Sequence, residues 1–124
     1  MTDQLTREII AAAYTVHNKM GFGYLEKVYE NSLAIELRKQ GFQVEQQLPV
    51  VVYYDKTVVG DFRADMIVNG KVILELKAVA NLAKEHEVQL VNYLKGANLP
   101  YGLLINFGTS VIVKRKYRDY KPPA

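Results

Sequence analysis

Apolar residues recur at helical spacing in three stretches of the sequence. Between Leu5 and Met20 they return at every third or fourth position, as on one face of a helix. The helices predicted in this way span residues 3–19, 24–40 and 85–97. Gly21-Phe-Gly23 follows the first helix and Gly41 follows the second, and glycine readily ends a helix because it adopts positive φ angles.

Short apolar or alternating runs, separated by turn residues, predict five strands. They span residues 43–54, 58–68, 71–78, 101–107 and 111–117. The turns within the strand pairs are Asp55-Lys56, Asn69-Gly70 and Gly108-Thr-Ser110. The element order ααβββαββ predicts an α/β (α+β) fold, with a mixed central sheet flanked by helices. We expect residues 1–124 to form one domain.

The second and third strands must match their apolar faces when they pair. By alternation, those faces comprise Phe62, Ala64, Met66 and Val68 on one strand, and Val72, Leu74, Leu76 and Ala78 on the other. Paired residues share a face, so Val68 must oppose Val72, which places Asp65 opposite Glu75. A two-residue Asn69-Gly70 turn would pair Val68 with the wrong residue. We therefore predict a three-residue loop or a β-bulge.

This register gathers two carboxylates and a lysine. Glu75 and Lys77 share a face because they are two residues apart in a strand, and Asp65 lies opposite Glu75. The group suits metal-dependent hydrolysis, in which the carboxylates hold Mg²⁺ or Mn²⁺ and the lysine acts on an attacking water. A salt bridge between Lys77 and either carboxylate is the simpler interpretation.

A further carboxylate lies in the apolar stripe of the second helix. Glu26 is aligned with Tyr29, Leu33 and Leu37, and a carboxylate on a core-facing stripe needs a partner. It either reaches the group around Asp65, or lies half exposed in the first helical turn, where the helix dipole favours it. Both interpretations stay open.

Composition narrows the class of protein further. The chain has 124 residues, 49% of them hydrophobic and only four of them proline, so we expect a folded domain. We find neither a membrane-spanning apolar run nor a signal pattern at the start, and therefore expect a cytoplasmic protein without a membrane partner. The absence of cysteine excludes disulfides and thiolate sites. The net charge of +3 permits nucleic-acid binding. Residues 121–124 are expected to be frayed.

Several ordered segments carry a family resemblance. Gly23-Tyr-Leu-Glu26-Lys-Val-Tyr29 resembles the signature of the GxxExxY family, which is similar to the PD-(D/E)XK nucleases with their Asp and Glu-x-Lys core. The resemblance extends over nearly the whole chain, although Ala64 stands where the superfamily name has proline. Its other segments are Leu33-Ala-Ile-Glu-Leu37, Ala64-Asp65, Glu75-Leu-Lys77, Gln89-Leu-Val-Asn-Tyr93-Leu94 and Gly102-Leu-Leu-Ile-Asn-Phe-Gly108.

The resemblance implies a restriction-endonuclease-like fold and a role for each matching residue. Asp65 and Glu75 would hold Mg²⁺ or Mn²⁺, with the Leu76 carbonyl completing part of the coordination shell. Glu26 would be an additional ligand from a core helix, as in resolvases. Lys77 would be the catalytic lysine, which takes a proton from the attacking water or orients it.

Residues outside this group match further motifs. Gln89 and Tyr93 match a Gln-x-x-x-Tyr motif of recombination-type exonucleases. Gln89 would orient a water, the lysine or a phosphate, or would simply tie its helix to the sheet, and Tyr93 would bind substrate. Lys114 and Arg115 belong to a basic run that would contact phosphates, although such runs usually protect a solvated edge strand.

The sequence thus predicts a metal-dependent nuclease that acts on nucleic acid, with DNA expected before RNA. By analogy with resolvases, a homodimer would extend the substrate surface. The alternative is a catalytically silent module that binds nucleic acid or protein through a nuclease fold. The complete set of site residues favours the enzyme.

Overall fold

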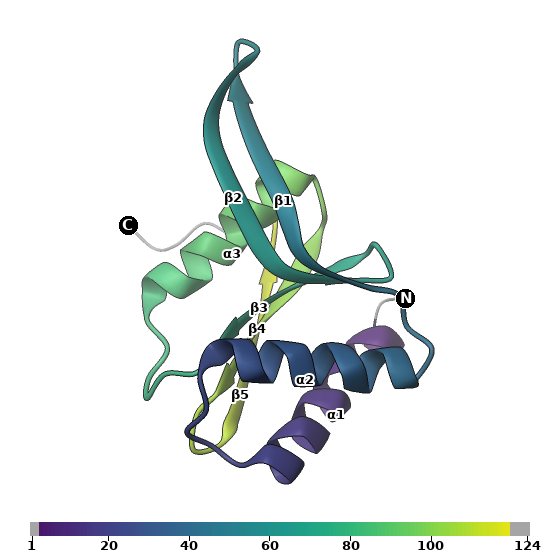
Figure 1. Ribbon diagram of the computed structural model, residues 1–124. Helices are drawn as coiled ribbons and strands as arrows, with labels where there is room; N and C mark the ends of the chain where they lie inside the picture. Colours follow the sequence, from purple (N-terminus) through teal and green to yellow (C-terminus); the bar gives the residue numbers. More distant parts are fainter. Residues whose placement is uncertain (1–2, 120–124) are drawn as a thin grey trace.

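One mixed five-stranded sheet separates two layers of helix in the computed structural model, which describes residues 3–119 (Figure 1). The predicted tail at 121–124 lies outside these residues. The elements are α1 (Asp3–Met20), α2 (Glu26–Lys39), β1 (Val44–Tyr54), β2 (Thr57–Val68), β3 (Val72–Lys77), α3 (Lys84–Ala97), β4 (Tyr101–Phe107) and β5 (Val111–Tyr117). The strands follow the order β1-β2-β3-β4-β5, and only β3 and β4 are parallel. The predicted fold class and element order are confirmed.

The core has two parts, one on each face of the sheet. Met66 and Leu74 belong to the larger cluster, which α1 and α2 cover. Ile67 and Ile73 belong to the smaller cluster, which includes Leu90 of α3. Because neighbouring residues of a strand point to opposite faces, β3 is apolar at almost every position and buried on both sides. Among the described helices, none is long and apolar enough to span a bilayer.

The hairpin of β2 and β3 has the predicted register. Val68 pairs with Val72, and the loop between them has three residues. Asn69 and Gly70 both have positive φ, and the Lys71 N–H donates to the Val68 carbonyl at 3.0 Å. Lys71 is thus a third loop residue, and Val68 pairs with Val72. In a two-residue turn, Val68 would have paired with Lys71. The two-residue alternative is excluded.

The predicted apolar face of β2 is correct only in its second half. Met66 belongs to the cluster under α1 and α2, whereas Ala64 belongs to the cluster under α3. Phe62 also lies toward α3, with its ring 5.9 Å from that of Tyr93. The prediction that all four alternate residues share one face was therefore wrong.

Gln47 of β1 marks the point where the two strands exchange faces. Gln46 pairs with Met66 and Leu48 with Ala64, so Gln47 lies opposite Asp65. Its φ of 57° is in the left-handed region, where the regular pleat cannot continue. The β1–β2 ribbon therefore turns over at this pair without gaining or losing a residue. We call this pair of Gln47 and Asp65 the crossover.

A buried carboxylate of α2 holds the crossover in place. Glu30 is 2% exposed and accepts three hydrogen bonds, from Lys27 Nζ at 3.0 Å, Gln46 Nε2 at 2.7 Å and Gln47 Nε2 at 3.0 Å. A buried carboxylate is tolerated only with such donors. The two bonds from Gln46 and Gln47 fix β1 to α2 beside Asp65.

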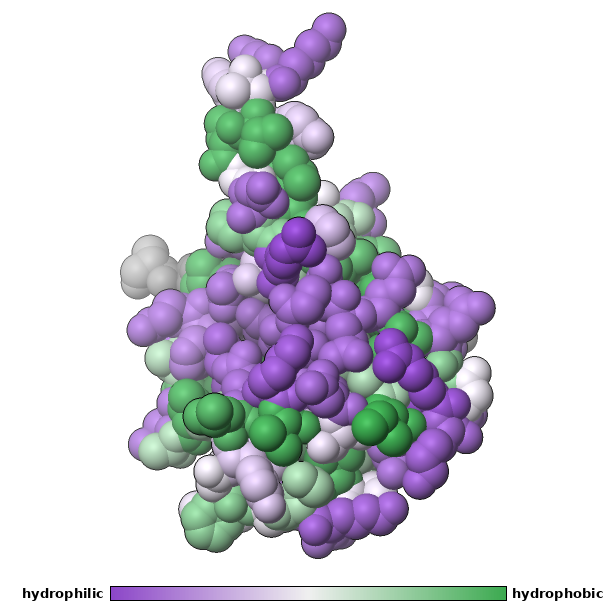
Figure 2. Space-filling view, viewed as in Figure 1, coloured by the Kyte–Doolittle hydropathy of each residue, from purple (hydrophilic) through white to green (hydrophobic). Residues whose placement is uncertain are grey.

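Beyond the crossover, the β1–β2 hairpin projects from the body of the molecule (Figure 1). The pairing of β2 with β3 ends at Met66, so the outer part of β2 pairs only with β1. Apolar side chains lie on this projection (Figure 2), with Val58 and Val59 more than half exposed. β2 and β3 therefore form a fork, and Asp65 is the first residue of β2 beyond its base.

We predict that Glu30→Gln lowers the free energy of unfolding by roughly 2–4 kcal/mol, because the new amide group faces three donors that lose their charged acceptor. Urea denaturation measures the change. Glu36→Gln on the same helix is the matched control. Its salt bridges, at 3.8 and 3.7 Å, involve lysines that are mostly exposed, and we expect a loss of about 0.5 kcal/mol or less. Equal losses in both variants would contradict the role of Glu30.

Candidate functional site

Asp65 bonds to β3 at the fork. Its Oδ2 accepts the Leu76 N–H at 2.8 Å. If the register of the hairpin continued, Leu76 would pair with Ala64, whose strand has already moved away. The Asp65 side chain thus takes the place of a neighbouring strand as acceptor, which fixes its carboxylate against β3.

Glu75 is the most unusual charged residue of the sheet. It is 3% exposed, and its buried Oε1 has no hydrogen-bond partner among the described residues. Burial raises the pKa of Glu75 to about 9, and the charge and hydrogen bonding of the adjacent Asp65 carboxylate act in the same direction. Lys77 opposes this shift in the pKa of Glu75. Two carboxyl groups in contact, one of them buried, need either a shared proton or a cation between them.

Glu26 is close to this pair without joining it in one cluster. It is the first residue of α2, and burial raises its pKa, the Lys77 charge lowers it and the Asp65 charge raises it. Within residues 3–119, however, no group of three or more His, Cys, Asp or Glu side chains is arranged to hold a metal ion. The predicted third carboxylate is therefore in electrostatic range but separate from the pair.

Lys77 ends β3 next to the carboxylates. Its charge lowers the pKa of Glu26 and of Glu75, so its ammonium group lies near both. Among the described residues it forms no ion pair with either of them or with Asp65. The simpler interpretation from the sequence, a structural salt bridge, is thus not what the structure contains.

The α3 helix brings Gln89 and Tyr93 toward the same carboxylates. Tyr93 is buried, and burial together with the charges of Glu75 and Asp65 raises the pKa of its hydroxyl to about 12. A hydrogen bond with the Gln89 side chain acts against this shift and lowers the pKa of Tyr93. Gln89 is linked to the carboxylates only through Tyr93, since no described bond joins it to them directly, and its role in the site stays a prediction.

Lys114 and Arg115 lie on opposite faces of β5. The register aligns Glu75 with Leu104 and Leu104 with Lys114, which places Lys114 in the same row as Glu75, two strands away. Its Nζ bonds to Glu87 of α3 at 3.1 Å, and Lys116 bonds to the same carboxylate. Lys114 is therefore neutralised by α3, and its role as a phosphate contact stays a prediction, as does that of exposed Arg115.

One buried residue near the site was missed by the sequence analysis. Asn106 lies next to Lys77 in the register of β3 and β4 and is 3% exposed. Its Oδ1 accepts the Val79 N–H at 3.0 Å and its Nδ2 donates to the Val79 carbonyl at 2.8 Å. These two bonds hold the irregular segment that follows Lys77. A lone amide within the apolar run of β4 is the signal that was available.

Comparison with known proteins supplies the family. The model of the PD-(D/E)XK nuclease superfamily matches residues 3–118, and it covers both carboxylates, the lysine and all eight described elements. Comparisons with curated proteins and with solved structures each found no match. The narrower resemblance to the GxxExxY family stays a prediction. The chain belongs to the PD-(D/E)XK nuclease superfamily.

Proposed function

We propose that this protein is a metal-dependent nuclease that hydrolyses phosphodiester bonds of nucleic acids. One observation carries the proposal: Glu75 is buried against Asp65 and leaves its Oε1 without a donor. A protein gains no stability from such a pair, so a bound ligand is the more economical explanation. Membership of a nuclease superfamily indicates which ligand to expect.

The donor set fits a divalent cation. Mg²⁺ and Mn²⁺ prefer oxygen ligands, and Mg²⁺ keeps several waters instead of requiring a complete protein cage. Asp65, Glu75 and the Leu76 carbonyl would hold the ion, and Glu26 would reach it through a water. When bound, such a cation polarises a phosphate and lowers the pKa of a water molecule.

The remaining residues would act around the attacking water. Lys77 lies near the carboxylates and forms no ion pair within residues 3–119, so its ammonium group is available to orient that water or to exchange a proton with it. Gln89 would hold the Tyr93 hydroxyl toward Glu75 and so orient the carboxylate from the α3 side. Lys114 and Arg115 would contact phosphates farther along the strand.

DNA is the substrate that we expect first, with RNA as the alternative, and a homodimer would extend the surface for either. The competing function is a silent binding module with the same fold. The separation of Glu26 from the Asp65–Glu75 pair favours that alternative, since no three-carboxylate site is preformed in the described chain. Cleavage assays separate the two functions.

We predict that the purified protein cleaves nucleic acid in Mg²⁺ or Mn²⁺, and that Lys77→Ala lowers the rate by about 10²- to 10⁴-fold, as expected for loss of a proton-transfer group. A screen over single-stranded, duplex and branched DNA and over RNA tests this. Lys71→Ala, which removes an exposed lysine from the loop of the same hairpin, should keep full activity. Equal rates for wild type and Lys77→Ala would identify a contaminating nuclease.

We also predict that Glu75→Gln stabilises the metal-free protein by about 1–3 kcal/mol at pH 8, because the amide can donate to Asp65 and carries no charge. The raised pKa means that folded Glu75 keeps a proton that the unfolded chain releases. Wild-type stability should therefore fall as the pH rises from about 4.5 toward 9, and Glu75→Gln should lack this slope.

Thermal denaturation at pH 5 and pH 8 with a chelator measures this difference. Glu36→Gln is the control. It keeps Glu75, so its stability should fall between pH 5 and pH 8 as that of the wild type does. Added Mg²⁺ should raise the melting temperature of the wild type but not of Glu75→Gln. A Glu75→Gln protein that is less stable than the wild type at pH 8 in chelator would contradict the prediction.

A further inference from the structure

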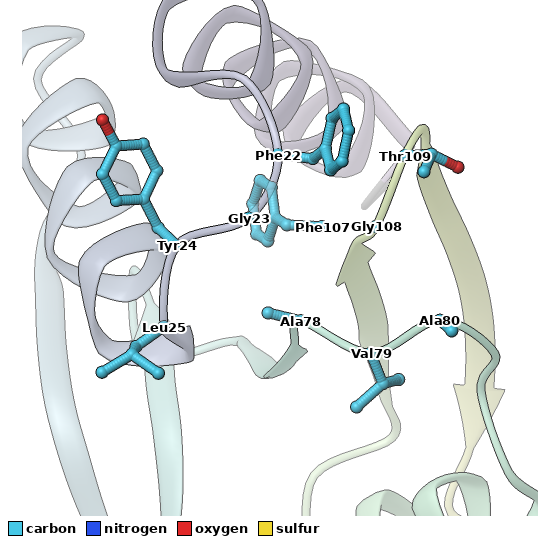
Figure 3. A pocket seen from close by; sticks show the side chains of 10 residues that line it. All are labelled: Phe22, Gly23, Tyr24, Leu25, Ala78, Val79, Ala80, Phe107, Gly108 and Thr109. Carbon is cyan, nitrogen blue, oxygen red and sulfur yellow. The ribbon is translucent and has the colours of Figure 1, made fainter.

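A second feature is a pocket whose lining residues adjoin Glu26 and Lys77 in the chain. A pocket of about 390 Å³ is enclosed by three short segments, residues 22–25, 78–80 and 107–109 (Figure 3). The first segment ends at Leu25, which is bonded to Glu26, and the second begins at Ala78, which is bonded to Lys77. Two of the stretches of chain that line the pocket therefore continue directly into residues of the candidate metal site.

The lining of the pocket is apolar and uncharged. Phe22, Tyr24, Leu25, Val79 and Phe107 contribute the largest side chains, and no charged residue is among those that line it. The charged groups begin at the adjacent positions, Glu26 and Lys77. A molecule that occupies both places needs an uncharged part beside a charged one.

The walls of the pocket are held in position by side chains. The Tyr29 hydroxyl donates to the Gly21 carbonyl at 2.7 Å and accepts the Tyr24 N–H at 3.3 Å, which fixes the first segment. Asn106 holds Val79 through the two bonds described above. His17 Nε2 lies 2.8 Å from the Gly108 carbonyl. Each segment is thus tied to a helix or strand, and the pocket is preformed.

Large apolar side chains are exposed at the rim. Phe22 is 65% exposed and Leu25 is 81% exposed, although both belong to a turn that is otherwise fixed. Isolated exposed apolar residues are common, but adjacent ones around a preformed pocket indicate a binding surface. An exposed aromatic ring is what a nucleobase stacks on, whatever its sequence.

We propose that this pocket binds an unpaired nucleobase of the substrate strand, next to the phosphate held at Asp65 and Glu75. The inference rests on the proposed nuclease function and names its substrate class. A nucleotide has the required division into an uncharged planar base and a charged phosphate. A base within a duplex is stacked on both faces and paired along one edge, and it cannot enter, so the preferred substrate is single-stranded, frayed or flapped nucleic acid.

The test is a binding measurement that does not depend on cleavage. In the Lys77→Ala background, fluorescence anisotropy compares a labelled single strand of 12 nucleotides with the same strand in a duplex. The single strand should bind more tightly. Phe22→Ala and, separately, Leu25→Ala should weaken binding of the single strand, by roughly 5- to 100-fold for the aromatic residue, and should leave the duplex unchanged.

Controls separate the pocket from general effects. Phe22→Tyr keeps an aromatic ring and should keep the affinity. Ile35→Ala removes a side chain of similar exposure, 60%, from the outer part of α2 and should change nothing. A fluorescent adenine analogue placed at successive positions should be quenched at one position, and this quenching should disappear in Phe22→Ala. Circular dichroism melts should coincide for all variants, since Phe22 and Leu25 are mostly exposed.

The outcomes distinguish this proposal from the nuclease proposal. If the protein cleaves duplexes and Phe22→Ala neither slows cleavage nor weakens single-strand binding, the base pocket is wrong and the nuclease stands. If binding of single strands depends on Phe22 but nothing is cleaved, the pocket stands and the nuclease proposal fails. If no single strand binds, the base pocket is overturned, and an apolar side chain of a partner protein becomes the alternative occupant.

Discussion

The hydrogen bond from the Leu76 N–H to the Asp65 carboxylate is the interaction on which the rest of this structure depends. It stands where β2 leaves β3, and it lets a sheet divide without leaving the inner strand short of an acceptor. The projecting hairpin, the crossover at Gln47 and the contact of Asp65 with Glu75 all follow from that division. The acceptor is an acidic side chain, so the same bond brings a carboxyl group to the fork beside Glu75.

Burying a carboxyl group costs free energy at Glu75, and the hydrogen bonds of Glu30 offset part of that cost. Glu75 is buried against another carboxyl group, whereas Glu30, equally buried, has three donors. The two residues show opposite solutions to one problem, since a buried carboxylate is either fully bonded or held ready for a ligand. Glu30 stabilises the region around the fork, whereas Glu75 does not stabilise it. Glu30 acts through its hydrogen bond with Gln47, the residue opposite Asp65.

The sequence predicted what depends on alternation and on chain order. The pairing of Val68 with Val72 followed from matching two apolar faces, and that match excluded the ordinary two-residue turn. The crossover could not be predicted, because Gln47 adopts a positive φ without being glycine or asparagine, and a local rotation leaves no pattern in composition. The position of Glu26 and the pairing of Lys114 with Glu87 depend on where helices lie, which periodicity does not determine.

The symmetry of the β2–β3 hairpin has a consequence for recognising related chains. Asp65 lies three residues before Val68, and Glu75 lies three residues after Val72, so each carboxylate is equally distant from the loop. The loop can lengthen without changing which residues face each other, because the pairing is counted from its two ends. A residue gained in one strand alone would instead separate the two acids. The interval between Asp and Glu-x-Lys should therefore vary widely among relatives, while the two strand segments that flank the loop keep equal lengths.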